Sequence, residues 1–169
     1  KGTFENMEVV DFPGIYSLNP LTKDEEIAVE KFKEALQQEE ISTIVCNLDV
    51  TRLERSLVFG LQAQNLARQN GKPIIFVLNM MDELQKRKLD INIKDFETML
   101  GSPVVAVSAK TQWGMEELRE ELRQVSRDPQ SYLPSVSVED RESVLKWAQE
   151  LGEKFGIQKG LILKNQNSL

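Results

Sequence analysis

Short runs of apolar residues alternate along this chain with longer segments whose apolar positions recur every three or four residues. The short runs are typical of buried β-strands and the longer segments of amphipathic helices. We predict strands over 7–11, 43–48, 74–78 and 103–107, the first of them paired across a tight turn with residues 2–4. We predict helices over 23–38, 51–69, 95–100, 114–125 and 139–155. Uninterrupted apolar strands that alternate with helices predict an α/β fold, in which a mainly parallel sheet is covered on both faces.

Prolines and serines after residue 127 interrupt this alternation. Such residues are typical of a linker, because proline and small polar residues favour turns over regular elements. We therefore predict an α/β domain over residues 1–127, a linker over 128–138 and a small helical segment over 139–169.

Composition excludes several classes of function. The chain of 169 residues has a formal net charge of −6, whereas a nucleic-acid-binding surface is basic. It has no histidine, which removes the commonest general base and the commonest metal ligand. The single cysteine, Cys46, lies in an apolar run and is expected to be a small buried hydrophobic residue. No apolar stretch approaches the roughly 20 residues that span a bilayer.

Three of the predicted apolar strands are followed by unusual polar groups. These are Asp11-Phe12-Pro13-Gly14, Asn79-Met80-Met81-Asp82 and Ser108-Ala109-Lys110. Each motif alone has a simple structural explanation, as a turn or a helix cap. Together they fall at the carboxyl ends of strands, where ligands bind in doubly wound sheets. Their order and placement indicate a nucleotide site.

The chemistry of these residues fits GTP or GDP with Mg²⁺. The carboxylate of Asp82 can accept hydrogen bonds from the ring N–H and the exocyclic amino group of guanine, a donor pair that adenine lacks. Asn79 would tie the loops of the pocket together, and the N–H of Ala109 would donate to the guanine oxygen. Asp11 would face Mg²⁺ through a water molecule. The N–H of Gly14 would meet the γ-phosphate, where a side chain would obstruct close approach.

The three motifs resemble the G3, G4 and G5 motifs of translation-factor-class GTPases. Two stretches narrow the resemblance to the ferrous iron transport protein B (FeoB) family. They are Val9-Val10-Asp11-Phe12-Pro13-Gly14-Ile15-Tyr16-Ser17-Leu18 and Asp49-Val50-Thr51-Arg52-Leu53-Glu54-Arg55-Ser56-Leu57. The resemblance covers Lys1 to about Val125. It implies a Ras-like, cytosolic GTPase domain on the cytoplasmic side of the bacterial inner membrane, joined to a membrane permease region for Fe²⁺.

The sequence departs from that family in the residues that would bind the phosphates of the nucleotide. No Gly-x-x-x-x-Gly-Lys-Ser/Thr phosphate-binding loop occurs in the 169 residues, and the Mg²⁺-binding threonine of switch I is also absent. We expect that the chain starts after the segment that carries the first strand, the phosphate loop and the first helix. We therefore expect it to bind nucleotide poorly.

Two single positions also differ from most GTPases. Met80 stands where a lysine usually lies along the base, so we expect weaker binding and faster nucleotide exchange. Ile15 follows Gly14, where Ras-type enzymes carry a glutamine that orients the attacking water. Hydrolysis should therefore be slow, and we assign no catalytic residue.

Two alternatives stay open. The chain could be a non-hydrolysing pseudo-GTPase or an interaction module that forms homo-oligomers through an exposed sheet edge. It could also be a ribosome-assembly or tRNA-modifying GTPase of the same class. The acidic composition and the stretch from Asp11 to Leu18 argue against this last alternative.

Overall fold

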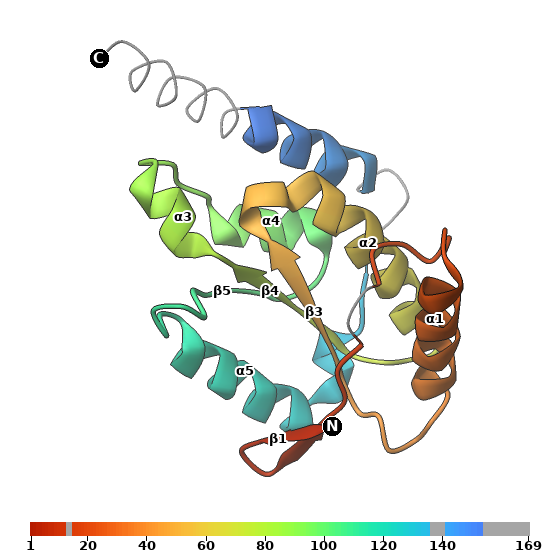
Figure 1. Ribbon diagram of the computed structural model, residues 1–169. Coiled ribbons are helices and arrows are strands. Elements are labelled where there is room, and N and C mark those ends of the chain that lie inside the picture. The colour runs from red at the N-terminus through yellow and green to blue at the C-terminus, as the bar shows by residue number, and fades with distance from the viewer. Residues whose placement is uncertain (13–14, 136–140, 154–169) are drawn as a thin grey trace.

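A three-stranded parallel sheet forms the centre of the molecule (Figure 1). The computed structural model describes residues 1–12, 15–135 and 141–153. The strands are β3 (Ile44–Asp49), β4 (Ile74–Asn79) and β5 (Val104–Ala106), in the order β3-β4-β5. The apolar run of β4 is buried on both faces, as expected of a central strand in a parallel sheet. The predicted parallel sheet is therefore confirmed.

The helices follow the predicted amphipathic segments closely, with one addition. They are α1 (Lys23–Leu36), α2 (Leu53–Gln69), α3 (Met81–Lys86), α4 (Ile93–Leu100) and α5 (Met115–Arg127), with 3₁₀ turns at Val50–Arg52 and Pro129–Tyr132. The short helix α3 was not predicted, because its six residues overlap the motif that follows β4. Helix α1 begins where its sequence indicates: the Thr22 side chain accepts from the N–H of Glu25 and caps the first turn.

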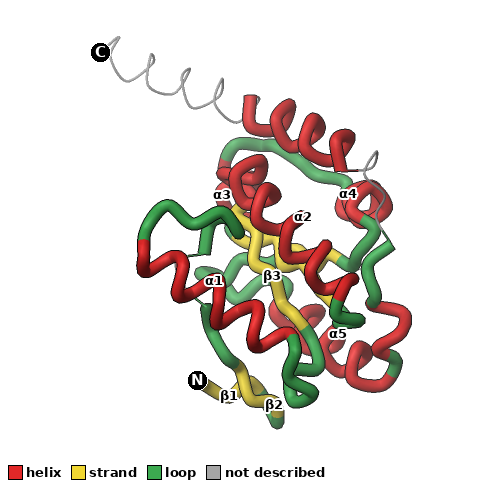
Figure 2. The backbone as a smooth tube through the Cα atoms, turned by 90° about the vertical axis from the view of Figure 1, so that its right-hand side faces the viewer, coloured by secondary structure: helices red, strands yellow, loops and turns green. Residues whose placement is uncertain are grey.

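The helices cover the two faces of the sheet, as Figures 1 and 2 show together. Helices α2 and α4 pack on one face, with Leu48, Phe76 and Leu78 in a shared core cluster. Helix α5 covers the other face, where Val77 and Val107 pack with its Leu122. Burying each of these side chains contributes about 1.5–3 kcal/mol. Alternate strand residues thus supply two separate apolar layers.

A last helix covers the outer side of α2 and α4. Residues 141–153 are helical, and Val144, Ala148 and Leu151 join the core cluster of α2. Trp147 stacks on Phe96 of α4, with the ring centroids 4.9 Å apart. The predicted helix over 139–155 is confirmed for these residues, while its first two and last two positions lie outside the described part. Within the described residues, no helix is long and apolar enough to cross a membrane.

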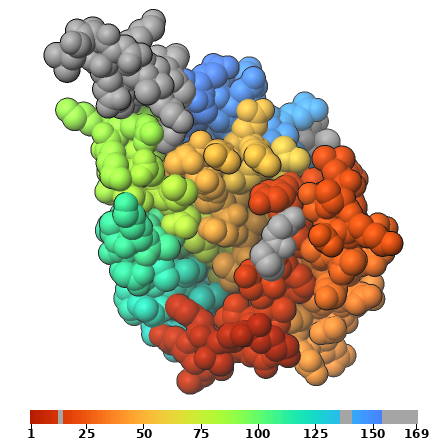
Figure 3. All heavy atoms as spheres, viewed as in Figure 1, coloured from red at the N-terminus to blue at the C-terminus, as the bar shows by residue number. Residues whose placement is uncertain are grey.

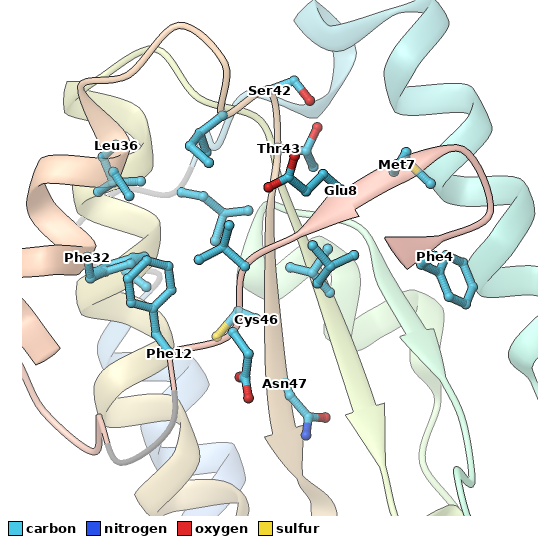
Figure 4. A pocket seen from close by; sticks show the side chains of 18 of the residues that line it. Phe4, Met7, Glu8, Phe12, Phe32, Leu36, Ser42, Thr43, Cys46 and Asn47 are labelled. Carbon is cyan, nitrogen blue, oxygen red and sulfur yellow. The ribbon is translucent and has the colours of Figure 1, made fainter. Parts of the chain in front are cut away.

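The N-terminal strands are separate from the parallel sheet. Strands β1 (Gly2–Phe4) and β2 (Met7–Val9) form the expected antiparallel pair, but β2 ends two residues earlier than predicted and pairs with β1 alone. Phe4 and Met7 pack against the α5 side of the core. Figure 3 shows this hairpin at one end of the molecule, between α5 and α1. A cavity of about 700 Å³ lies between β2 and β3, lined by residues 7–12 on one side and 43–47 on the other (Figure 4).

Candidate functional site at the carboxyl ends of β4 and β5

The parallel register brings the two predicted base-binding motifs to the same edge of the sheet. Pairing continues beyond β5, since the N–H of Val107 donates to the carbonyl of Leu78 at 2.8 Å and the N–H of Met81 donates to the carbonyl of Val107 at 3.2 Å. The segments after β4 and after β5 therefore lie side by side. This is the edge at which ligands bind in open α/β sheets.

Asn79 links these two segments directly. Its Oδ1 accepts from the N–H of Ala109 at 3.0 Å and from the N–H of Met80 at 2.8 Å. Met80 has a left-handed backbone with φ of 67°, which lets the chain turn sharply from β4 into α3. The predicted role of Asn79 in tying the loops together thus has a geometric basis in this structure.

Asp82 is held in a fixed orientation in the first turn of α3. The hydroxyl of Ser108, which is 1% exposed, donates to its Oδ1 at 2.9 Å and accepts from the N–H of Thr111 at 3.3 Å. The Asp82 side chain is 14% exposed, and its Oδ2 lies 3.9 Å from the Lys86 ammonium. A carboxylate has about four acceptor positions, so Asp82 retains capacity for a ligand.

Charged neighbours on α3 support the same helix. Arg87 and Lys86 both hydrogen-bond to the carboxylate of Glu83, and these bonds lower its pKa. The carboxylate of Glu83 therefore binds Lys86 and Arg87, one turn further along the helix. The carboxylate that hydrogen-bonds to Ser108 is that of Asp82.

The loop after Ser108 depends on a glycine. Its backbone closes through a hydrogen bond from the N–H of Ser108 to the carbonyl of Trp113 at 2.9 Å. Gly114 then adopts φ of 77°, and a Cβ built there would lie 2.1 Å from the carbonyl oxygen of Ala106. Only glycine fits, because both the backbone angle and the close approach exclude a side chain.

The remaining predicted base-site residues take different positions. The Met81 side chain is 7% exposed and packs into the core, so only its backbone faces the loop segments. Met80 is 37% exposed. Lys110 is also exposed, next to the Ala109 amide.

The phosphate-side residues lie elsewhere. Asp11 and Phe12 line the cavity next to β3, and the ring of Phe12 packs edge-on against Phe32 of α1 at 5.7 Å. Pro13 and Gly14 lie outside the described residues. The structure thus brings Asn79, Asp82, Ser108 and Ala109 together and places Asp11 apart from them. Among the described residues, no group of three or more histidine, cysteine, aspartate or glutamate side chains could hold a metal ion.

Two residues of α2 hold the loop after Phe12, and sequence reasoning did not find them. The Gln62 side chain accepts from the N–H of Leu18 at 2.7 Å and from the hydroxyl of Ser17 at 3.4 Å. The Arg55 guanidinium lies 5.2 Å from the centre of the Tyr16 ring. Arg55 and Gln62 are seven positions apart and so lie on one face of α2, but this spacing does not indicate which residues they contact.

A family model described as ferrous iron transport protein B matches residues 1–122. The chain belongs to the ferrous iron transport protein B family. It is 34% identical over 113 residues to the Fe(2+) transporter FeoB of Leptospira biflexa, covering 67% of this chain and 15% of that protein. It is 30% identical over 155 residues to the Fe(2+) transporter FeoB of Campylobacter jejuni, covering 88% and 24%. The chain therefore spans less than a quarter of these FeoB relatives.

Solved structures agree with this membership. The FeoB G-domain from Methanococcus jannaschii is 33% identical, with a TM-score of 0.58 over 70% of this chain and 71% of that one. The cytosolic domain of FeoB from L. pneumophila has a TM-score of 0.59 over 90% and 76%, at 24% identity. These neighbours confirm the predicted Ras-like α/β G-domain fold.

Proposed function

We propose that this chain is the guanine-nucleotide-binding part of an Fe²⁺ transporter, which acts on the cytoplasmic side of the bacterial inner membrane and regulates the membrane permease region of the same protein. The observation that carries the proposal is the cluster in which Asn79 and Ser108 position the Ala109 amide and the Asp82 carboxylate. Chains of this fold from S. thermophilus are described as bound to mGMPPNP and to GDP.

Asp82 is the residue that selects the base. With Oδ1 fixed by Ser108, the carboxylate can accept from the ring N–H and the exocyclic amino group of guanine, and the Ser108 hydroxyl keeps it from rotating away. Adenine offers no matching donor pair, so its binding would leave the carboxylate without partners at a cost of about 1–3 kcal/mol.

The amide of Ala109 already has a partner in this structure. Since its N–H donates to Asn79 Oδ1, donation to a guanine oxygen requires that the hydrogen bond be shared between the two acceptors. Lys110, the next residue, lies at the same exposed turn. We therefore expect the Asn79 side chain to shift its hydrogen bonds when a base binds.

Asp11 fits a Mg²⁺ site through a water molecule. It is an exposed carboxylate, which is a hard oxygen ligand of the kind that Mg²⁺ takes together with water and phosphate oxygens. Bound Mg²⁺ would supply charge neutralisation at the phosphates. Among the described residues, no group of three or more histidine, cysteine, aspartate or glutamate side chains could hold a metal ion, so the ion would depend on the nucleotide for its other ligands.

We expect weak nucleotide affinity and slow hydrolysis for the 169 residues alone. A phosphate-binding loop motif is absent from the sequence, and Ile15 cannot orient a water molecule. The base would therefore contribute most of the binding.

Titration with GDP and ADP tests this proposal, using the 169-residue chain and a polypeptide extended ahead of Lys1 by family sequence. The extended form should bind GDP tightly and ADP poorly, and Asp82→Ala should abolish the difference. Asp95→Ala, at an exposed position in the first turn of α4, should leave it unchanged. Sub-micromolar GDP binding by the 169-residue chain would contradict the expected weakness, and equal binding of both nucleotides would contradict the base site.

One observation favours a second candidate, an interaction module that forms homo-oligomers. Among the described strands, none pairs with the edge of β3 that faces away from β4, and open strand edges favour pairing with another chain. In that case the mass in solution should rise with protein concentration and should not respond to GDP.

A further inference from the structure

The loop that carries Ser108 and Ala109 also carries a tryptophan that the core does not cover. Trp113 is 50% exposed, whereas the other tryptophan of the chain, Trp147, stacks on Phe96 with the ring centroids 4.9 Å apart. Tryptophan has a large apolar side chain that on average is well buried. About half of the Trp113 side chain is therefore open to a contact from outside the described residues.

The backbone determines on which side of the loop this indole stands. Ser108 and Trp113 form an isolated antiparallel bridge, in which the N–H of Ser108 donates to the carbonyl of Trp113 at 2.9 Å. Side chains of directly opposed residues in an antiparallel pair project to the same face, with their Cβ atoms about 5 Å apart. The Ser108 hydroxyl projects toward Asp82 and donates to its Oδ1 at 2.9 Å. The indole therefore projects to the same face of the loop as the hydroxyl that holds the Asp82 carboxylate.

The residues on both sides of Trp113 have left-handed backbones, with φ of 64° at Gln112 and 77° at Gly114. This conformation is uncommon for glutamine. A hydrogen bond from Gln112 Nε2 to the carbonyl of Ala109, at 2.8 Å, closes the turn that holds it. Strained backbone of this kind persists where the surrounding structure determines it, and it is concentrated at ligand-binding segments. The loop thus holds the backbone of Trp113 in one direction.

We propose that the indole of Trp113 lies against a guanine base held by Asp82 and shields the edge of that base from water. The inference rests on the proposed function, because it needs a base at Asp82. Aromatic rings contact the faces of all nucleobases alike, so Trp113 would strengthen binding while Asp82 selects guanine.

Shielding matters because the Asp82 side chain is 14% exposed, so water competes with a ligand for its remaining acceptor positions. Excluding that water lowers the local dielectric constant, which strengthens the hydrogen bonds between a carboxylate and a base. Trp113 is therefore a binding residue that acts on the same hydrogen bonds as Asp82 and Ser108.

NMR of the 169-residue chain with millimolar GDP or ADP tests the proposal. The chain has two tryptophans, so two indole N–H resonances are followed, and replacing each tryptophan by phenylalanine in turn assigns them. We expect GDP to shift the indole resonance of Trp113 and ADP to leave it in place. The indole of Trp147 is the internal control and should respond to neither nucleotide, because it stacks on Phe96.

Two variants measure what the indole contributes to binding. Trp113→Ser should raise the dissociation constant for GDP about fivefold, whereas Trp113→Phe, which keeps an aromatic ring, should stay within about twofold of the original value. The amide of Thr111, which donates to the Ser108 hydroxyl, reports whether the loop itself has changed. Its resonance should be the same in both variants, and the midpoint of urea unfolding should also be the same.

Three results would overturn the role of Trp113. The first is a GDP-induced shift of the Asp82 and Ala109 amides without a response of the Trp113 indole, which would leave the proposed function standing. The second is a weaker affinity in Trp113→Ser together with a displaced Thr111 amide, which would assign the loss to the loop. The third is the absence of any GDP response at Asp82, Ala109 and Trp113, which would overturn the base site as well.

Discussion

The two ends of the predicted nucleotide site differ in how completely the chain builds them. At the carboxyl ends of β4 and β5, Asn79, Asp82 and Ser108 each have a hydrogen-bond partner from the other segment. In residues 1–22, β2 pairs with β1 alone, and Val9 and Leu21 are 43% and 93% exposed. The difference indicates that the base-binding region is held by hydrogen bonds between the segments after β4 and β5, whereas among the described strands β1 and β2 pair only with each other.

Gly114→Ala should cause the largest loss of stability, because it disrupts the base-binding region, which is the more completely built of the two regions. The substitution forces a positive φ on alanine and a contact with the Ala106 carbonyl, so the free energy of unfolding should fall by about 3 kcal/mol. Gly71→Ala is the matched control: its φ is also positive, but nothing lies within 4 Å, so only about 1 kcal/mol should be lost. Urea unfolding of both variants measures the difference, and equal losses would contradict the steric account.

Asp82→Ala should weaken guanine binding by about 2 kcal/mol, roughly 30-fold, since it removes charge-assisted hydrogen bonds to the base. ADP binding should not change. Asp82→Asn provides a sharper test, because its amide should favour xanthine, which has an oxygen where guanine has the exocyclic amino group. Competition between GDP and XDP measures the switch, and an unchanged preference for GDP would show that Asp82 does not contact the base.

The titration of the Cys46 thiol shows whether water reaches the side of β3 that lines the cavity. Burial raises the pKa of Cys46 to about 12. The folded state therefore holds a proton that the unfolded state releases from about pH 9, so stability should decline as pH rises from 9 toward 12, by up to about 1.4 kcal/mol per pH unit.

Below pH 9 this contribution is constant, because the thiol is protonated in both states. Cys46→Ala should remove the part of the alkaline decline in stability that the thiol causes. Urea unfolding of both proteins between pH 9 and 12 measures this part, because lysine and tyrosine titration contributes equally to the two proteins and cancels in the difference. Rapid modification of the native thiol at pH 8 would show that water reaches this wall.

Gln62→Ala should have the smallest effect on stability. It acts on the loop at Ser17 and Leu18, in the less completely built region. It removes the acceptor for the N–H of Leu18, so stability should fall by about 1 kcal/mol or less and the Leu18 amide should exchange faster. Gln62→Glu keeps an acceptor oxygen and should preserve slow exchange. Equally fast exchange in both variants would show that Gln62 does not hold the loop.

Much of the fold could be predicted, because in most elements the local pattern of apolar residues agrees with how those residues pack in the structure. The run Ile74–Leu78 is apolar at every position, and it forms the central strand to within one residue. The separation of the β1-β2 hairpin from the sheet could not be predicted, because the residues of β2 alternate normally and only its neighbours decide what it pairs with. Helix α3 was missed because turn and cap residues occupy the same positions.

Part of the candidate site could likewise be predicted from the sequence, and part could not. The meeting of the 79–82 and 108–110 segments could be predicted, since parallel strands end at one edge of the sheet. The contacts of Gln62 with the 17–18 loop could not, because a polar residue on a helix gives no sign of a partner 44 positions away. The placement of Asp11 beside the cavity next to β3 depends on long-range packing, which local sequence does not encode.

Chemical-shift mapping of the 169-residue chain with millimolar GDP or ADP tests most directly the claim that the base site is complete in these residues. We predict that GDP shifts the backbone amides of Ala109, Lys110 and Asp82, that ADP does not, and that residues 2–9 respond to neither. Equal shifts with both nucleotides, or no shift with GDP at any attainable concentration, would contradict the account.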